Sequence, residues 1–344
     1  MHTLRRRIPL RALSALSSVL LLGAFSSPAD YTLDDLARFD FAAEAAPADP
    51  GTPAVSTPFR GGFTDHVVVI SLDGLRPDAI ARFDAETLMK LMREGSYTLQ
   101  ARTIMPSKTL PSHTSMLTGV EPEDHGITWN TDETDTHGHV SVPTIFARAR
   151  EQGLTAAAFF SKTKFHHLEV PQSLDHVVSP RSGKWTAGRT VRNVESYLES
   201  GAKPNLMFVH IGEPDYAGHF WGWMSYMYGR AVRKADDAVE SVLEAADAAY
   251  GEGNYTVIVT ADHGGHGWNH GGSDPRDVTI PWITWGKGVR GGMLLADGIH
   301  TTDTAATALW ALGVPATTDS DGTAVAHAFN SRPSLPATGS MAIR

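Results

Sequence analysis

The stretch Tyr255-Thr-Val-Ile-Val-Thr-Ala-Asp-His-Gly-Gly-His-Gly-Trp-Asn-His-Gly-Gly272 joins an apolar run to a loop rich in glycine and histidine. Residues 255–260 are short, β-branched and nearly free of polar side chains, which is typical of a strand buried on both faces. Open α/β sheets bind their ligands at the carboxyl ends of such strands. The stretch therefore predicts an α/β fold with a functional loop directly after residue 260.

The loop after this strand combines one carboxylate with several imidazoles. These residues are Asp262, His263, His266 and His270. Carboxylate oxygens and imidazole nitrogens are the ligands that zinc and related metals take in proteins. A glycine-rich surface turn with exposed histidines is the alternative, and the loop alone does not exclude it. The combination of Asp-His with two further histidines favours a metal site.

Composition limits what else the chain can do. Its 344 residues suit one large α/β domain or two modest ones. The net charge of -9 argues against a nucleic-acid-binding surface. The absence of cysteine excludes disulfides, thiolate zinc sites and a cysteine nucleophile. Any metal site must therefore use oxygen and nitrogen ligands.

The ends of the chain differ from its middle. Residues 1–29 have the pattern of an export signal, with arginines at 5–7, an apolar stretch over 12–25 and small residues before the expected cleavage point. The apolar run is short for a transmembrane helix, although an uncleaved anchor stays open. Residues 30–62 are expected to form a flexible linker and residues 331–344 a loose tail. We expect a periplasmic or secreted protein with one catalytic domain over residues 63–330 and no stable membrane span after signal cleavage.

Strand-like and helix-like patterns alternate across residues 63–330. Apolar strand-like runs occupy residues 66–72, 154–160, 205–211, 255–260 and 280–285. Helical patterns occupy residues 84–94, 143–153, 190–200, 226–250 and 301–312, and another helix is expected to open near residue 111. Residues 165–188 are expected to be an irregular surface region. The alternation predicts a single three-layer α/β/α domain with a mostly parallel central sheet.

Two more predicted strands end in acidic residues. Asp73 follows the run at residues 66–72, and Asp215 and His219 follow the run at residues 205–211. Asp215 and His219 are four residues apart, so both would lie on one face if that segment were helical. Because parallel strands end at one edge of a sheet, these side chains are expected to meet Asp262 and His263.

A hydroxyl-rich segment precedes the helix expected near Pro111. Backbone N–H groups at a helix start favour an anion, so this segment is suited to hold a phosphate, and Lys108 adds positive charge beside it. Thr109 becomes a possible nucleophile if a metal lowers its pKa. Ordinary helix capping by Ser or Thr explains the same residues equally well on this segment alone.

Together these segments resemble a known family, the alkaline phosphatase superfamily, and within it the nucleotide pyrophosphatase/phosphodiesterase (type I phosphodiesterase) branch. The resemblance covers residues 65–313. It rests on the motifs Asp73-Gly-Leu-Arg-Pro-Asp78, Lys108-Thr-Leu-Pro-Ser-His113, Leu117-Thr-Gly-Val-Glu-Pro-Glu-Asp-His-Gly-Ile127, Glu213-Pro-Asp-Tyr-Ala-Gly-His219 and Ala261-Asp-His-Gly264. It implies an alkaline-phosphatase-like fold and phosphate-ester hydrolysis.

The resemblance also implies two sets of metal ligands. The first set is Asp73, Thr109, Asp262 and His263, and the second is Asp215, His219 and His270. Thr109 would be the nucleophile that forms a covalent phospho-threonine. Two divalent cations about 4 Å apart can clamp an in-line displacement, and these ligands favour Zn2+ while leaving manganese or iron open. His266 competes with His270 for the last position, and His300 is a more distant candidate.

Substrate contacts are expected from Asn130, Ser112 and Lys108. Members that cleave nucleotides often carry an aromatic residue after the nucleophile and an asparagine two positions later. This chain has Leu110 and Ser112 at those positions, which weakens the case for a nucleotide. The aromatic residues nearby in sequence either line a pocket or are ordinary core and surface residues; they are Trp129, Trp221, Trp223 and Tyr226.

The main hypothesis is an exported dimetal hydrolase that cleaves phosphodiester or pyrophosphate bonds in a small-molecule phosphate ester. A phosphomonoesterase is the first alternative, and it would need extra positive groups, for which Lys108, Arg76 and Lys162 are the nearby candidates. A phosphotransferase that uses the same metals is the second alternative. A non-catalytic binding protein with this fold is the third.

Overall fold

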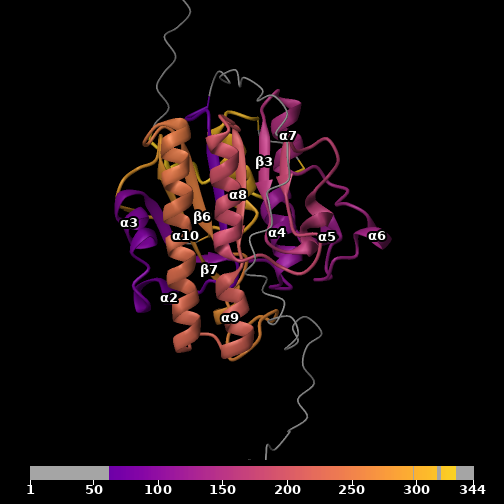
Figure 1. Cartoon of the computed structure of the whole chain (residues 1–344), viewed down its shortest axis with the longest axis vertical. Helices are drawn as coiled ribbons and strands as arrows, with labels where there is room; N and C mark the ends of the chain where they lie inside the picture. Colours follow the sequence, from indigo (N-terminus) through magenta and orange to yellow (C-terminus); the bar gives the residue numbers. More distant parts are fainter. Residues whose placement is uncertain (1–61, 297, 316–318, 331–344) are drawn as a thin grey trace, which may run out of the picture.

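The structure is a computed structural model that describes residues 62–296, 298–315 and 319–330 (Figure 1). The predicted signal, nearly all of the predicted linker and the predicted tail lie outside the described residues. Every helix of the described ranges is too short or too polar to cross a bilayer.

An eight-stranded sheet forms the centre of the molecule, in the order β4-β3-β5-β1-β6-β7-β2-β8. The strands are β1 Val67–Leu72, β2 Ser96–Arg102, β3 Ala156–Phe159, β4 His176–Val178, β5 Leu206–Ile211, β6 Thr256–Thr260, β7 Thr279–Gly286 and β8 Met293–Leu294. Pairing is parallel from β4 through β6 and between β2 and β8, whereas β7 runs antiparallel to both β6 and β2. The predicted mostly parallel sheet is confirmed.

The three central strands are buried along their whole length, as their continuous apolar sequences predict. Strand β1 lies between β5 and β6, and Leu72 pairs with Ile211 while Ser71 pairs with Thr260. This register ends all three strands at one edge of the sheet. The residues that follow them in sequence therefore start from neighbouring positions.

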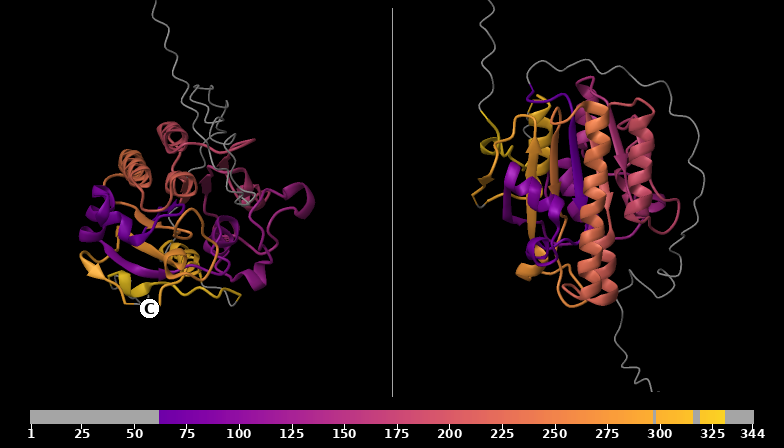
Figure 2. Two further views of the ribbon diagram at one scale, coloured as in Figure 1. Left: turned by 90° about the horizontal axis from the view of Figure 1, so that it is seen from below. Right: turned by 60° about the vertical axis from the view of Figure 1, so that its left-hand side comes forward.

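Helices cover both faces of the sheet, as predicted for a three-layer domain (Figure 2). The helices on one face are α2 Pro77–Arg82, α3 Glu86–Glu94, α8 Ala187–Glu199, α9 Glu213–Trp221 and α10 Tyr226–Tyr250. The helices on the other face are α4 Thr109–Thr118, α5 Pro122–His125, α7 Ile145–Glu151 and α12 Asp303–Ala311. The short elements are α6 Thr134–His137, α11 Pro275–Val278, η1 Thr163–Leu168 and η2 Ala326–Ala328.

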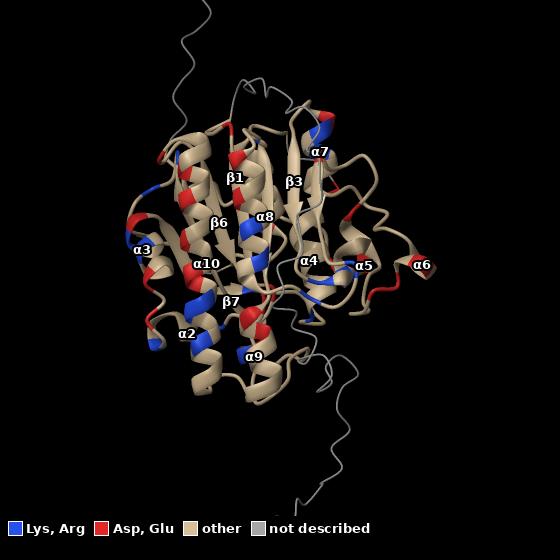
Figure 3. Cartoon of the chain, in the orientation of Figure 1, with Lys and Arg blue, Asp and Glu red and all other residues tan. Residues whose placement is uncertain are grey.

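Helix α10 carries charges of both signs. Figure 3 shows its basic residues near α9 and its acidic residues along the remainder of the helix. One of the acidic residues, Asp236, is buried and accepts hydrogen bonds from the backbone N–H groups of Thr87 (2.9 Å) and Leu88 (2.8 Å). Asp236 thereby caps the start of α3 from the neighbouring helix, because the first N–H groups of a helix lack partners within it.

One expectation about local structure was wrong, and one strand was missed. Residues 165–188 are not an irregular surface region, because part of η1 and the edge strand β4 lie there and Phe165 is fully buried. Strand β2 was not predicted, because its buried and exposed residues are interspersed and its sequence is largely polar. The segment after β5, expected to be a loop unless helical, is helix α9, with Pro214 in its first turn.

Candidate active site

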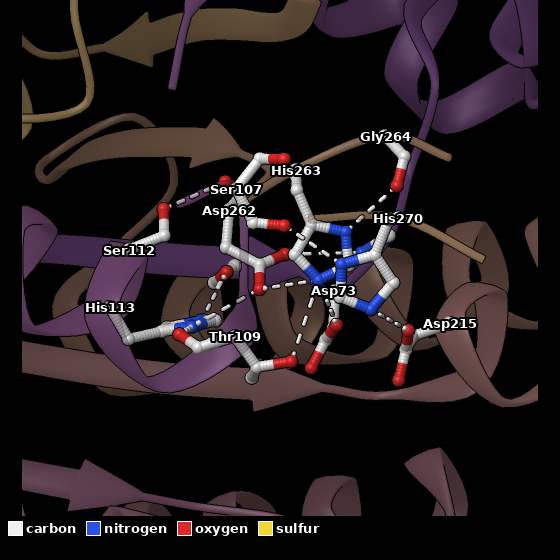
Figure 4. A network of polar contacts seen from close by, with 12 residues as sticks. Asp73, Ser107, Thr109, Ser112, His113, Asp215, Asp262, His263, Gly264 and His270 are labelled. Atoms are coloured by element: carbon white, nitrogen blue, oxygen red, sulfur yellow. Dashed lines mark hydrogen bonds and ion pairs between the residues drawn. The ribbon is translucent and has the colours of Figure 1, made fainter. Parts of the chain in front are cut away.

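Buried acidic residues gather where β1, β5 and β6 end (Figure 4). Asp73 directly follows β1, Asp215 lies in the first turn of α9 after β5, and Asp262 and His263 follow β6. All four are fully buried. The structure therefore brings these predicted site residues together at the sheet edge.

Gly74 allows the chains after β1 and β5 to approach closely. Its φ angle of 72° is in the left-handed region, and a Cβ atom there would lie 2.9 Å from the Cα atom of Asp215. The Asp215 N–H donates to the Asp73 carbonyl oxygen (2.9 Å), and the Gly74 N–H donates to Asp262 Oδ1 (3.1 Å). A larger residue at position 74 would push the carboxylates apart.

Asp215, His219 and His270 form one group of candidate metal ligands. Asp215 and His219 lie one helical turn apart on α9, with 3.2 Å between Asp215 Oδ1 and His219 Nε2. His270 Nε2 lies 3.0 Å from His219 Nε2 and 3.6 Å from Asp215 Oδ1. One atom from each residue thus faces a common point, where a cation would relieve the close approach of the two imidazole nitrogens.

Asp73, Asp262, His263 and Thr109 form the second group. His263 Nε2 lies 3.5 Å from Asp73 Oδ1, 3.2 Å from Asp262 Oδ2 and 3.4 Å from Thr109 Oγ1. Asp215 also reaches this group, since Asp73, Asp215 and His263 each offer an atom within 4.8 Å of the others. The two ligand groups are therefore adjacent and share Asp215.

Two features of this arrangement fit bound cations. Asp73 Oδ1 and Asp262 Oδ2 are buried and have no hydrogen-bond partner among the described residues. Unpartnered buried carboxylate oxygens are costly, and a metal ion is a usual explanation for them.

The histidines are also oriented as metal ligands usually are. In each of them Nδ1 donates to a backbone carbonyl, which leaves Nε2 facing the ligand groups. The acceptors are the carbonyl oxygens of Trp268 for His219 (3.0 Å), Ser107 for His270 (2.8 Å) and Gly264 for His263 (2.8 Å).

The local charges favour the metal-binding protonation state of Asp73, Asp215 and His270. Burial and Asp215 act to raise the pKa of Asp73, but the Lys162 ammonium and His210 outweigh them and hold it below its usual value. Burial likewise acts to raise the pKa of Asp215, and Lys162 and His219 hold it well below normal. Burial, together with neighbouring His263, lowers the pKa of His270. Ionised carboxylates and a neutral imidazole are the forms that bind metals. Burial acts to lower the pKa of His263, but the carboxylates of Asp262 and Asp73 outweigh it and raise that pKa.

Thr109 is the first residue of α4, so this helix begins two residues before the predicted Pro111. Thr109 is fully buried, and Lys108 at the N-cap is half-buried beside Gly271. Asn130 Oδ1 accepts from the Leu110 N–H (2.9 Å), so its amide nitrogen is the end that remains for a ligand. The predicted nucleophile and anion contacts thus share the start of one helix.

Ser112 has a different role from the predicted substrate contact. It is fully buried one turn into α4, and its hydroxyl donates to the Asp262 carbonyl oxygen (2.7 Å) and pairs with the Thr103 hydroxyl (2.8 Å). We correct the prediction: Ser112 holds the backbone that carries Asp262.

Sequence reasoning missed two buried histidines beside the site. His113 lies 2.8 Å from Ser71 Oγ and donates to the Thr109 carbonyl oxygen (2.8 Å). His210 donates through Nε2 to Asp73 Oδ2 (2.9 Å), and burial lowers the pKa of His210 to about 4. His210 stands inside the apolar strand β5, and a histidine in such a strand was the available signal.

One of the four aromatic residues lies beside the site, and the others are ordinary core or surface residues. Trp223 is buried beside His219 and donates to the Gly74 carbonyl oxygen (3.0 Å), so it forms part of the wall behind the ligands. Trp221 lines a groove on the opposite face of α9, and Tyr226 is 74% exposed. Trp129 packs against histidines of α6 and η1 as an ordinary partly buried residue.

The structure gives other surroundings to His266 and His300, the two alternatives to His270 as the last ligand. His266 Nδ1 lies 2.6 Å from Asp277 Oδ1 and braces the loop against α11, while His300 is exposed.

We predict that the variant His270→Ala binds one of the two metal ions more than about 100-fold more weakly and loses it on purification, since a ligand should matter more than its supporting partners. The matched variant His266→Ala should keep wild-type metal content. Elemental analysis after gel filtration measures both, and equal metal loss in the two variants would contradict the assignment.

Carboxylates and histidines that could hold metal ions lie at the edge of an α/β sheet, beside a threonine at a helix start. A model of the type I phosphodiesterase / nucleotide pyrophosphatase family matches residues 67–272, which include every residue of the two ligand groups. The chain belongs to this family.

Individual relatives are distant. Human ectonucleotide pyrophosphatase/phosphodiesterase family member 1 is 24% identical over 220 residues, covering 58% of this chain and 24% of the relative. Mouse bis(5'-adenosyl)-triphosphatase is 24% identical over 231 residues, covering 60% of this chain and 50% of the relative. Human GPI ethanolamine phosphate transferase 1 is 23% identical over 250 residues, covering 65% of this chain and 26% of the relative. The chain thus spans between a quarter and a half of these relatives.

Solved structures agree on the fold. Murine ectonucleotide pyrophosphatase/phosphodiesterase 5, an inactive variant in complex with AMP, superposes with a TM-score of 0.67 at 16% identity and covers 77% of this chain and 100% of its own. A 2-O glycosaminoglycan sulfatase superposes with a TM-score of 0.64 at 16% identity, covering 77% and 74%. The alkaline-phosphatase-like fold is confirmed.

Proposed function

We propose that this protein is an exported dimetal hydrolase that cleaves phosphodiester or pyrophosphate bonds through a covalent phospho-Thr109. The observation that carries the proposal is the position of Thr109 Oγ1, at the start of α4 and 3.4 Å from His263 Nε2. Membership of the phosphodiesterase family supports the reaction class. The signal-like pattern of residues 1–29 supports export.

The residues divide the work as follows. Asp73, Thr109, Asp262 and His263 would hold one ion, and Asp215, His219 and His270 the other, with zinc favoured by the mixed oxygen and nitrogen ligands. Such ions supply positive charge for the phosphoryl oxygens and lower the pKa of a bound hydroxyl. Thr109 Oγ1 gives up its proton and attacks phosphorus, and the ester oxygen departs with its organic group and takes up a proton. Water then cleaves the Thr109–phosphorus bond and releases the product.

Leu110 and the nearby cations indicate which kind of phosphate ester the site favours. Leu110 is fully buried, so it offers no surface on which a nucleobase could stack. Arg76 is paired with Asp78 (2.6 Å), and Lys162 contacts Asp73 and Asp215. These two cations are already compensated, so of the three candidates Lys108, at the N-cap of α4, is the one left to meet the phosphate. One cation favours a diester, with one negative charge, over a monoester with two. The transferase among the relatives keeps phosphotransfer as a second candidate.

Two chromogenic esters test this preference. With zinc-loaded protein, kcat/KM for bis-para-nitrophenyl phosphate should exceed that for para-nitrophenyl phosphate by at least about tenfold. This ratio corresponds to an activation free energy that is about 1.4 kcal/mol higher for the monoester, whose second negative charge has no partner. A reversed ratio would replace the diesterase by a monoesterase. Transfer of the phosphoryl group to an added alcohol, detected by mass spectrometry, would identify a transferase.

A further inference from the structure

Lys162 lies inside the candidate site although it is neither a metal ligand nor a nucleophile in the proposed reaction. It follows β3, at the N-cap of η1, and its side chain is 4% exposed. The ammonium nitrogen Nζ lies 2.7 Å from Asp73 Oδ2 and 2.6 Å from Asp215 Oδ2. A single cation therefore joins one carboxylate from each proposed ligand set.

The two oxygens of each carboxylate have different neighbours. Asp73 Oδ2 contacts Lys162 and His210, while Asp73 Oδ1 lies 3.5 Å from His263 Nε2. Asp215 Oδ2 contacts Lys162, while Asp215 Oδ1 lies 3.2 Å from His219 Nε2. In both residues Oδ2 is the oxygen on the lysine, and Oδ1 is the oxygen that faces the histidine ligands.

Lys162 is itself held firmly in place. The preceding residue, Ser161, hydrogen-bonds through Oγ to His210 Nδ1 (2.7 Å). The backbone of Lys162 forms a β-bridge with Lys184, and Nζ lies 5.1 Å from the centre of the Tyr216 ring. A cation fixed by backbone, ring and two carboxylates is placed to orient its partners.

We infer that Lys162 is a positioning residue of the dimetal centre, which fixes the carboxylates of Asp73 and Asp215 so that each presents Oδ1 to an ion. This inference rests on the proposed metal centre. A buried charged hydrogen bond restricts carboxylate rotation, and losing the partner of a metal ligand typically weakens metal binding by 10- to 100-fold. Lys162 thus acts through Asp73 and Asp215, whereas a lysine that only binds substrate would leave metal affinity unchanged.

The test compares Lys162→Met with Lys184→Met. Methionine keeps much of the length of lysine but removes the charge and the donors. Lys184 lies across the β-bridge and its Nζ is 4.5 Å from the centre of the same Tyr216 ring, so its variant removes a neighbouring charge without removing either contact to Asp73 or Asp215. Metal-free proteins are titrated with zinc against a chromophoric chelator at fixed pH, and circular dichroism checks folding.

We expect at least one zinc ion to bind about 10- to 100-fold more weakly to Lys162→Met, and wild-type affinity in Lys184→Met. Equal or tighter zinc binding by Lys162→Met would overturn the inference, and a raised KM at unchanged affinity would instead assign Lys162 to the substrate. If the wild-type protein bound no zinc, the proposed function would fall and this inference with it, whereas equal affinities overturn only the inference.

A second measurement needs no variant and applies if Lys162→Met does not fold. In a crystal structure of the zinc-loaded wild-type protein, Lys162 Nζ should stay within hydrogen-bond distance of Asp73 Oδ2 and Asp215 Oδ2, with the ions on the Oδ1 atoms. Ions bound through the Oδ2 atoms, with Lys162 displaced, would overturn the inference.

Discussion

Replacing Thr109 by alanine should reduce the turnover of bis-para-nitrophenyl phosphate by about 10³-fold or more, because the proposed reaction loses its nucleophile. Metal content should stay close to that of the wild-type protein. The other proposed ligands come from β1, α9 and the loop after β6, and none of their contacts with one another depends on Thr109. Steady-state rates and elemental analysis of the same preparations measure both effects.

The matched control is Thr109→Ser, which keeps an oxygen at the start of α4 and should retain much of the activity. Wild-type protein that is acid-quenched during turnover of bis-para-nitrophenyl phosphate should carry a para-nitrophenyl phosphate group on Thr109, detectable by mass spectrometry, and the alanine variant should not. Wild-type-like turnover by Thr109→Ala would show that water attacks the substrate directly, and the covalent route would have to be abandoned.

Removal of metal should have the second large effect. Complete chelation is expected to lower activity by about 100-fold or more, and added zinc should restore it, because the proposed reaction draws its charge stabilisation from the ions. Stability should also fall. Zinc at a hundredfold excess over its Kd stabilises the fold by about 2.7 kcal/mol, which corresponds to roughly 5–10 °C in Tm for a domain of this size.

The stability effect has a local cause. Without cations, Asp73 Oδ1 and Asp262 Oδ2 remain buried without hydrogen bonds among the described residues. Differential scanning calorimetry with and without chelator measures the shift. Full activity in protein that elemental analysis shows to be metal-free would refute the dimetal proposal.

The sequence predicted the central part of the fold because that part follows from burial. Strands β1, β5 and β6 are continuous apolar runs, and α10 begins and ends where its amphipathic pattern does. Strand β2 has a mixed polar pattern, since it pairs with the antiparallel β7 near the sheet edge, and periodicity alone does not distinguish it from a loop. The edge strand β4 has only partly buried and exposed residues, so it lacked the apolar signal.

Some residues of the candidate site could be predicted from the sequence, and others could not. Asp73, Asp215 and Asp262 were predictable because each follows a recognisable strand, and parallel strands end together. Ser112 was misassigned, because its place one turn into a helix turns its hydroxyl to the Asp262 backbone. Lys162 was only one of several nearby cations in the sequence. Its contact with two carboxylates depends on β3 lying next to β5, which no local pattern reports.

The order of the ligands along the chain affects how the site is assembled. His270, the last of them, is held by the carbonyl of Ser107, 163 positions earlier. A chain synthesised only as far as β6 could pair its parallel strands and bring Asp73 near Asp215, yet it would lack His270. A complete ligand set therefore exists only after residue 270 has been made and has docked on Ser107. Full metal uptake would then mark a chain extended at least through residue 270, and an elemental assay would distinguish such chains from shorter ones.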